Sequence, residues 1–141
     1  MKALVALLAM VALAGCGGGA SEGDFVARAI KSCTETNNRI RLLGAPMSFN
    51  DTQLYARRAK DAVADGIDAL NDLSPPADVR ASFDLYLVTL EERQRLLGEL
   101  AAAADRNSMN DFRNVSVEID ALGQTAREQA IAVGLAACEP K

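Results

Sequence analysis

The chain holds three cysteines, Cys16, Cys33 and Cys138, and no histidine. Cysteine thiolates can carry nucleophilic, redox or metal-binding chemistry. The absence of histidine excludes a Ser-His-Asp or Cys-His relay, an imidazole ligand for a metal or haem, and a histidine-based pH switch. The cysteines are therefore the first residues whose chemistry needs an explanation.

Cys16 stands at the end of an apolar N-terminal run. Lys2 provides a positive charge, and residues 3–14 are 12 consecutive apolar residues. This run is shorter than the roughly 20 residues that span a bilayer, but it has the length of the apolar region of a secretory signal. The four residues that end it resemble the lipobox of bacterial lipoproteins: Leu13, Ala14, Gly15 and Cys16.

This resemblance implies where the protein is located and how it is attached. In bacterial lipoproteins the lipobox cysteine is acylated and the signal peptide is cut just before it, which implies removal of residues 1–15 and a lipid on Cys16. Several acyl chains on one residue give stable anchoring. We expect an extracytoplasmic protein on the outer face of the cell membrane. Where two membranes are present we expect it on the outer membrane, because Gly17 rather than Asp after the cysteine resembles the outer-membrane sorting pattern of bacterial lipoproteins. The alternative is an ordinary secretory signal with a chance cysteine.

Residues 16–23 contain four glycines and are expected to form a flexible tether. Residues 24–141 are then the length of a single domain. Loss of residues 1–15 removes Lys2 and takes the formal charge from −4 to −5. Neither an anionic lipid surface nor a nucleic-acid backbone attracts such a chain. We therefore expect contact with the membrane through the lipid alone and no nucleic-acid partner.

The two remaining cysteines are expected to have a structural role. In an oxidising, exported setting such a pair most often forms a disulfide, so we expect Cys33 to pair with Cys138. One alternative is a redox-active dithiol, which usually shows Cys-x-x-Cys spacing. The other is a soft-metal site, which needs more thiolates or histidine.

Four aspartates recur at spacings of four, three and four residues and form an acidic stripe: Asp61, Asp65, Asp68 and Asp72. This stripe lies opposite the apolar face of its predicted helix, so we expect a solvated outer face. Asp68 and Asp72 lie near the negative end of the helix dipole, which is a mildly unfavourable placement. The alternative is therefore a surface for a cationic partner or a divalent ion. Screening of the stripe by Arg80 across the following turn explains the placement equally well.

Two further sets of residues have both a structural and a functional interpretation. Three amides lie on or beside the predicted apolar stripes: Asn37, Gln94 and Gln129. Buried amides usually pair with each other, and the alternative is a small polar pocket. Met47, Phe49 and Met109 are expected around the turns at one end, either packed there or as an apolar tip for a partner.

Glu91 and Glu92 are adjacent, so their side chains point about 100° apart on a helix and are poorly placed for acid-base catalysis. We expect Arg95 instead to pair with Glu91 and Glu99, each pair contributing a few tenths of a kcal/mol. No glycine-rich phosphate-binding motif occurs in the chain. We therefore assign no catalytic residue, no metal ligand and no cofactor.

Four segments with helical periodicity must position these residues. The first runs from a cap at Asp24 to a glycine stop. The second covers residues 51–73, with Asn50 as its N-terminal cap and Phe49 packed onto Leu54 across that cap.

The third segment covers residues 77–104 and follows a Pro-Pro break. The fourth starts at a Ser108 cap and stops at Gly134 and Leu135, which have the pattern of a Schellman motif. Long helices with short connections favour antiparallel neighbours. We therefore predict an all-α protein, an up-down-up-down four-helix bundle with one disulfide.

The mature domain also resembles small helical lipoproteins that have one cysteine in the first helix and one after a C-terminal Gly-Leu. The matching residues are Phe25, Cys33, Asn37, Pro75, Pro76, Gly134, Leu135 and Cys138. This resemblance implies the bundle and brings no activity with it.

The leading hypothesis is a lipid-anchored, extracytoplasmic interaction module of the bacterial cell envelope, without catalysis, that binds another envelope protein or a small ligand. The alternative is a bundle that carries a small apolar or amphipathic ligand in a central cavity. Alanines on the stripes either let the helices approach closely or leave space: Ala29, Ala59, Ala126 and Ala130. A cavity of several hundred Å³ favours the carrier, and a filled core favours the interaction module.

Overall fold

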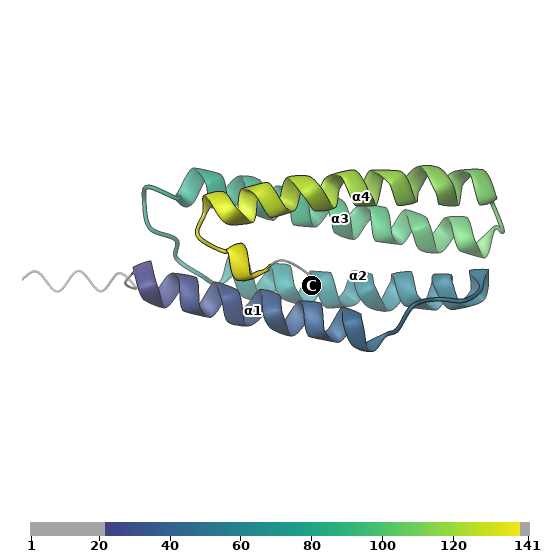
Figure 1. Ribbon diagram of the computed structural model, residues 1–141, viewed down its shortest axis with the longest axis horizontal. Helices are drawn as coiled ribbons and strands as arrows, with labels where there is room; N and C mark the ends of the chain where they lie inside the picture. Colours follow the sequence, from purple (N-terminus) through teal and green to yellow (C-terminus); the bar gives the residue numbers. More distant parts are fainter. Residues whose placement is uncertain (1–21, 139–141) are drawn as a thin grey trace, which may run out of the picture.

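The computed structural model describes residues 22–138, which form four α-helices, one short 3₁₀ helix and no strand. The elements are α1 (Glu22–Leu42), α2 (Phe49–Asn71), α3 (Arg80–Asp105), α4 (Met109–Ala132) and η1 (Ala136–Cys138) (Figure 1). Consecutive helices run antiparallel and pack against each other, which confirms the predicted four-helix bundle.

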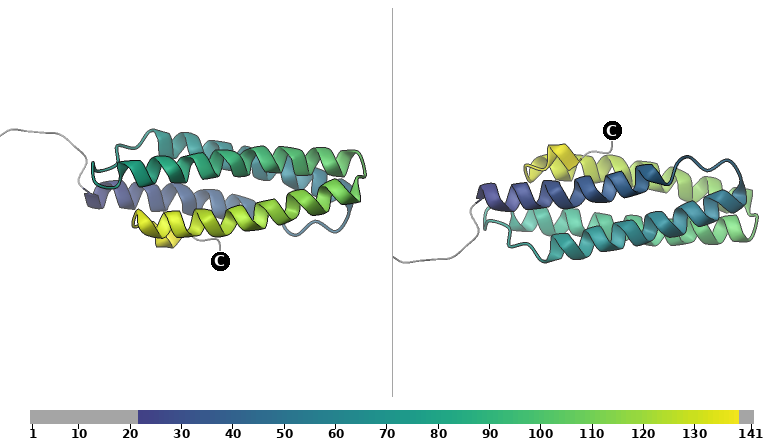
Figure 2. Two further views of the ribbon diagram at one scale, coloured as in Figure 1. Left: turned by 90° about the horizontal axis from the view of Figure 1, so that it is seen from above. Right: turned by 90° about the horizontal axis from the view of Figure 1, so that it is seen from below.

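One of the four seams of the bundle differs from the others. The pairs α1 and α2, α2 and α3, and α3 and α4 are in contact, whereas α1 and α4 have no Cα atoms within 8 Å of each other. The 3₁₀ helix η1 packs against both α1 and α4 toward the end of the bundle where α1 starts (Figure 2). The seam between α1 and α4 is therefore bridged by η1 rather than closed by direct helix packing.

Serine caps the N-terminus of two helices. At α4 the prediction is confirmed, because Ser108 Oγ accepts a hydrogen bond from the Asp111 N–H at 3.5 Å. At α2 the predicted cap, Asn50, is wrong. Ser48 is the cap there, and its Oγ accepts from the Asp51 N–H at 3.1 Å. Serine and asparagine are equally good capping residues. Because the helix is capped by Ser48, two residues before Asn50, Asn50 lies inside the first turn.

Two helices begin at other residues than expected. Helix α1 starts at Glu22, so Glu22 and Gly23 belong to its first turn and not to the tether. Helix α3 starts at Arg80 rather than at residue 77. The reason is a tight turn after the prolines, in which the Val79 N–H donates to the Pro76 carbonyl oxygen at 3.2 Å.

The predicted Schellman motif ends α4. Gly134 has a φ of +78°, which is the left-handed region that favours glycine. The Leu135 N–H donates to the Ala130 carbonyl oxygen at 2.7 Å, and the Gly134 N–H donates to that of Ile131 at 3.1 Å. The motif turns the chain back so that η1 can reach α1.

The core consists of three clusters of buried residues along the bundle. The cluster nearest the start of α1 contains Phe25 and Phe83, whose rings meet edge to face with centroids 5.1 Å apart. The middle cluster is formed by Ala59, Val63, Ile67 and Leu97. The third, near the turn between α3 and α4, is formed by Ala56, Leu100 and Ala101.

Candidate functional site

The predicted disulfide between Cys33 and Cys138 is present and joins α1 to η1, with Cα atoms 5.3 Å apart. One helical turn after Cys33, Asn37 Nδ2 donates a hydrogen bond to the Cys138 carbonyl oxygen at 2.8 Å. Leu135, just before η1, is fully buried. A covalent bond, a hydrogen bond and an apolar contact thus hold the end of the chain across the seam.

The expected pairing of the three amides with each other is wrong, because no hydrogen bond joins any two of them. Asn37 binds the backbone of η1 because the chain end folds back onto α1 at this position. The Oε1 atom of Gln129 is buried and has no hydrogen-bond partner within residues 22–138.

Next to the disulfide lies a cavity of about 480 Å³, lined by residues of all four helices and of η1. Typical small-molecule pockets measure about 300–1,000 Å³. Most of the side chains that face it from α1, α2 and α3 are apolar: Ile40, Val63, Ile67, Leu70, Tyr86 and Leu90. The disulfide itself forms part of the wall.

Small residues on α4 explain why space remains there. Gly123, Ala126 and Ala130 line the cavity. A Cβ atom added at Gly123 would meet no other atom within 4 Å. Ala29 and Ala59 do not line the cavity and are 0% and 1% exposed, whereas Ala126 and Ala130 line it and are also buried in the core. The alanines of the predicted stripes therefore do both things, closing the core at some positions and leaving space at others.

A cation also lines the cavity, at Arg93 of α3. The Nε atom of Arg93 is buried and has no hydrogen-bond partner in the described part of the chain. Sequence reasoning missed this residue and placed the adjacent Gln94, which does not line the cavity, on or beside the apolar stripe. The signal was available in the spacing, since Arg93 lies three residues after Leu90 and four before Leu97.

Arg93 lies at the boundary between the cavity and a second hollow. The second hollow, of about 570 Å³, extends along α1 and the start of the loop that follows it. The two hollows share three lining residues, Asn37, Ile40 and Arg93. These three shared residues mark the junction of the two hollows, which we call the neck.

Tyr86 is a buried wall residue of the cavity and is 5% exposed. Burial raises the pKa of its phenol above the ordinary value, and the positive charge of Arg93 partly opposes this rise. At neutral pH the wall of the cavity therefore contains the neutral phenol of Tyr86 and the positively charged guanidinium of Arg93.

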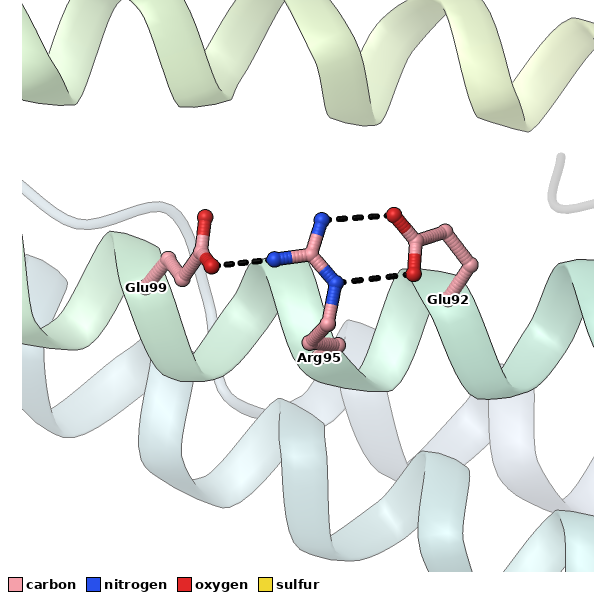
Figure 3. Close-up of polar contacts among 3 residues, drawn as sticks. All are labelled: Glu92, Arg95 and Glu99. Atoms are coloured by element: carbon pink, nitrogen blue, oxygen red, sulfur yellow. Dashed lines mark hydrogen bonds and ion pairs between the residues drawn. The ribbon is translucent and has the colours of Figure 1, made fainter.

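A separate ion-pair network lies on α3 (Figure 3). Arg95 Nε and Nη2 donate to the two carboxylate oxygens of Glu92 at 2.8 and 2.5 Å, and Nη1 donates to Glu99. The pair with Glu99 was predicted. The predicted pair with Glu91 is wrong, because Glu92 offers both oxygens to the guanidinium fork. This hydrogen bonding lowers the pKa of Glu92 and raises that of Arg95, so the network is fully charged at neutral pH.

The acidic stripe of α2 is a solvent-exposed face, with all four aspartates exposed: Asp61, Asp65, Asp68 and Asp72. Asp65 already has a cationic partner, since Arg39 Nη1 of α1 lies 2.6 Å from its carboxylate. Arg80, the expected partner, instead donates to the Pro75 carbonyl oxygen. Within residues 22–138 no group of three or more cysteine or carboxylate side chains is arranged to hold a metal ion.

The end of the bundle formed by the α1–α2 loop and the α3–α4 turn exposes part of the predicted apolar tip (Figure 1). Met47 and Met109 are 94% and 51% exposed. Phe49 is partly buried against Phe112 of α4, with ring centroids 5.4 Å apart. Leu54, its expected partner, is half exposed. Of the three predicted tip residues, Met47 and Met109 therefore remain exposed, and the half-exposed Leu54 adds to the apolar surface beside Met47.

The predicted lipidation site, Cys16, lies outside the described residues, as do the signal segment 1–15 and most of the tether. None of the helices within residues 22–138 is both long and apolar enough to cross a membrane.

Comparison of the chain with protein families, with curated proteins and with solved structures gives no match. The fold and the site together define a disulfide-linked four-helix bundle with a partly open cavity, which is bordered on α4 by three exposed polar residues: Asp120, Gln124 and Arg127.

Proposed function

We propose that the protein is a non-catalytic carrier of a small, largely apolar ligand, held by a lipid on Cys16 at the extracytoplasmic face of a bacterial membrane. The observation that supports a carrier is the cavity of about 480 Å³ among the four helices. Protein cores are packed as densely as organic crystals, and voids larger than a water molecule are few. A space of this size, apolar on its α2 side and with a few polar groups elsewhere in its wall, is typical of a ligand pocket.

The proposed anchor fits a ligand that is found in membranes. Helix α1 begins at Glu22, six residues after Cys16. Six extended residues span at most about 21 Å, so an acylated Cys16 holds the bundle close to the lipid surface. Apolar molecules concentrate in that surface, and a carrier tethered there meets them without crossing a wide aqueous space.

A second candidate, an interaction module that binds another envelope protein, is favoured by the exposed methionine pair at the far end of the bundle, Met47 and Met109. Exposed apolar residues mark partner surfaces when they form a large patch. Even with the half-exposed Leu54, three side chains make only a small patch, so the carrier is the better supported of the two functions.

The carrier is tested by titrating the full chain with the neutral fluorescent probe N-phenylnaphthylamine. Cys16→Ser keeps the protein free of lipid, and Gly123→Leu in the same background places a side chain in the open space at Gly123. We expect saturable binding to Cys16→Ser and a loss of most of it with Gly123→Leu. Equal binding by both proteins would show that the probe does not occupy the cavity and would contradict the carrier.

The anchor needs a test of its own. Wild-type protein should fractionate with membranes when expressed in a bacterium, and Cys16→Ser should lose that attachment because it cannot be acylated. Membrane attachment of the two proteins to the same extent would contradict the proposed lipidation.

A further inference from the structure

Arg93 occupies an unusual position for a cation. Its Nε atom is buried in the wall of a mostly apolar cavity and has no hydrogen-bond partner within residues 22–138. Removing a charged donor from water without supplying an acceptor is unfavourable. Arg95, two residues further along α3, provides a comparison, because its guanidinium forms ion pairs with both Glu92 and Glu99 (Figure 3). No carboxylate of the described residues forms an ion pair with Arg93.

Three charged residues line the cavity, Arg93, Asp120 and Arg127. Arg93 is the cation among them with a buried Nε atom that has no hydrogen-bond partner within residues 22–138. A guanidinium only donates hydrogen bonds, so a ligand that satisfies it presents an acceptor, and an anionic acceptor binds it most strongly. A guanidinium presents its N–H groups as a planar fork that matches the two oxygens of a carboxylate.

The position of Arg93 at the neck also determines the orientation of such a ligand in the cavity. The interior of the cavity beyond Arg93 is bounded by Val63, Ile67 and Leu70 of α2 and by the disulfide. An apolar chain fits against this part of the wall, where a charged head would lose its hydration without gaining a polar partner. The head therefore belongs at the neck, where Asn37 and Arg93 line both the cavity and the outer hollow.

We propose that the cavity binds a single-chain amphiphile with a carboxylate head, a fatty acid, with the head paired to Arg93 and the chain extending inward. This inference rests on the proposed carrier function and adds the chemical class of the ligand. At roughly 30 Å³ for each water-sized group, the cavity of about 480 Å³ holds about 16 such groups. Dodecanoate, a medium-length fatty acid, is close to this size.

The test compares dodecanoate with its uncharged methyl ester as competitors of N-phenylnaphthylamine. The proteins are Cys16→Ser and the same chain with Arg93→Gln. We expect dodecanoate to displace the probe from Cys16→Ser at a lower concentration than the ester does. Arg93→Gln should weaken the binding of dodecanoate by roughly tenfold to a hundredfold, the range for a hydrogen-bonded charge, and should weaken the binding of the ester and the probe far less.

Two further variants serve as controls. Arg113→Gln removes an exposed arginine of α4 that does not line the cavity, so it should leave dodecanoate binding unchanged. Arg93→Lys keeps the charge but not the fork, so it should retain part of the preference for the acid. It also keeps the test valid if Arg93→Gln fails to fold.

The outcomes separate the two proposals. If the probe and both competitors bind but the acid and the ester compete equally in every variant, the carboxylate head is wrong and the carrier function stands. The same conclusion follows if Arg93→Gln weakens the acid and the ester alike. If neither the probe nor the competitors bind to Cys16→Ser, the carrier function itself is wrong, and the inference falls with it.

Discussion

The seam between α2 and α3 and the seam between α1 and α4 both contain alanines, but these alanines have opposite effects on the packing of the two seams. In the first, the helices pack directly, and Ala56, Ala59 and Ala103 are almost completely buried. In the second, Ala126 and Ala130 line a cavity, because α1 and α4 do not meet and η1 bridges them. Small residues close a seam only where the helices are free to approach, and here a disulfide-linked segment sets their separation.

The largest effect on this comparison is expected from removing the disulfide. The double variant Cys33→Ala/Cys138→Ala, made in the Cys16→Ser chain, frees η1 and leaves the α1–α4 seam without its covalent bridge. The sequence separation of 105 residues corresponds to about 4.7 kcal/mol in the chain-entropy model. We expect a loss approaching this value in the free energy of unfolding, measured by urea denaturation, and loss of probe binding.

Reductant provides the matched control for this variant. It should destabilise the Cys16→Ser protein by a similar amount and should leave the cysteine-free variant unchanged. A loss below about 1 kcal/mol would mean that η1 holds the seam without the disulfide.

The next largest effect is expected at the residue that seats η1. Leu135 is 0% exposed and follows the glycine that ends α4. Leu135→Ala should lower the free energy of unfolding by about 2–5 kcal/mol, as for other buried leucines. Leu85→Ala on the outer face of α3 is the control, because Leu85 is 60% exposed and its loss should have little effect. Equal effects at both positions would contradict the packing of η1.

Sequence reasoning predicted the elements of the bundle better than the space between them. Periodicity and stop signals predicted four helices, and the positions of Cys33 and Cys138 predicted the disulfide that links the ends. The cap of α2 was misassigned because Ser48 and Asn50 are equally good capping residues, and local sequence does not choose between them.

The cavity could not be predicted, because its volume depends on the distances between helices, which a stripe of apolar residues does not specify. The spacing does place Arg93 on the buried face of α3, but a charged residue there is usually assigned to the surface. Arg93 was missed because its charge suggests an exposed position, whereas its spacing places it on the buried face of the helix.

A smaller effect, of opposite sign in two seams, is expected from a pair of helical glycines. Gly123→Ala should stabilise the protein by about 1 kcal/mol, because alanine favours a helix and its methyl group enters open space. Gly66→Ala should destabilise it by about 1 kcal/mol or more, because the new methyl group would collide with Thr36 of α1. Urea denaturation measures both, and the same sign at the two positions would contradict the account of the seams.

The smallest predicted effect concerns pH. Burial raises the pKa of Tyr86, so the unfolded chain loses this phenolic proton before the folded protein does. The contribution of Tyr86 to stability is thus fully present below about pH 10 and is lost as the pH rises through the folded pKa. In a Tyr55→Phe background Tyr86 is the only tyrosine, so ultraviolet titration reports it alone. Ionisation at the ordinary pKa of tyrosine would indicate a wall in contact with water.

The most direct test of the cavity is the thermal stability of Gly123→Leu with and without dodecanoate, both in the Cys16→Ser chain. A filled cavity and better helix propensity should raise the melting temperature of the variant by about 5–10 °C in the absence of ligand. Dodecanoate should then raise the melting temperature of the parent and leave that of the variant unchanged. A variant that melts below its parent, or an equal rise for both proteins with ligand, would contradict a ligand site among the four helices.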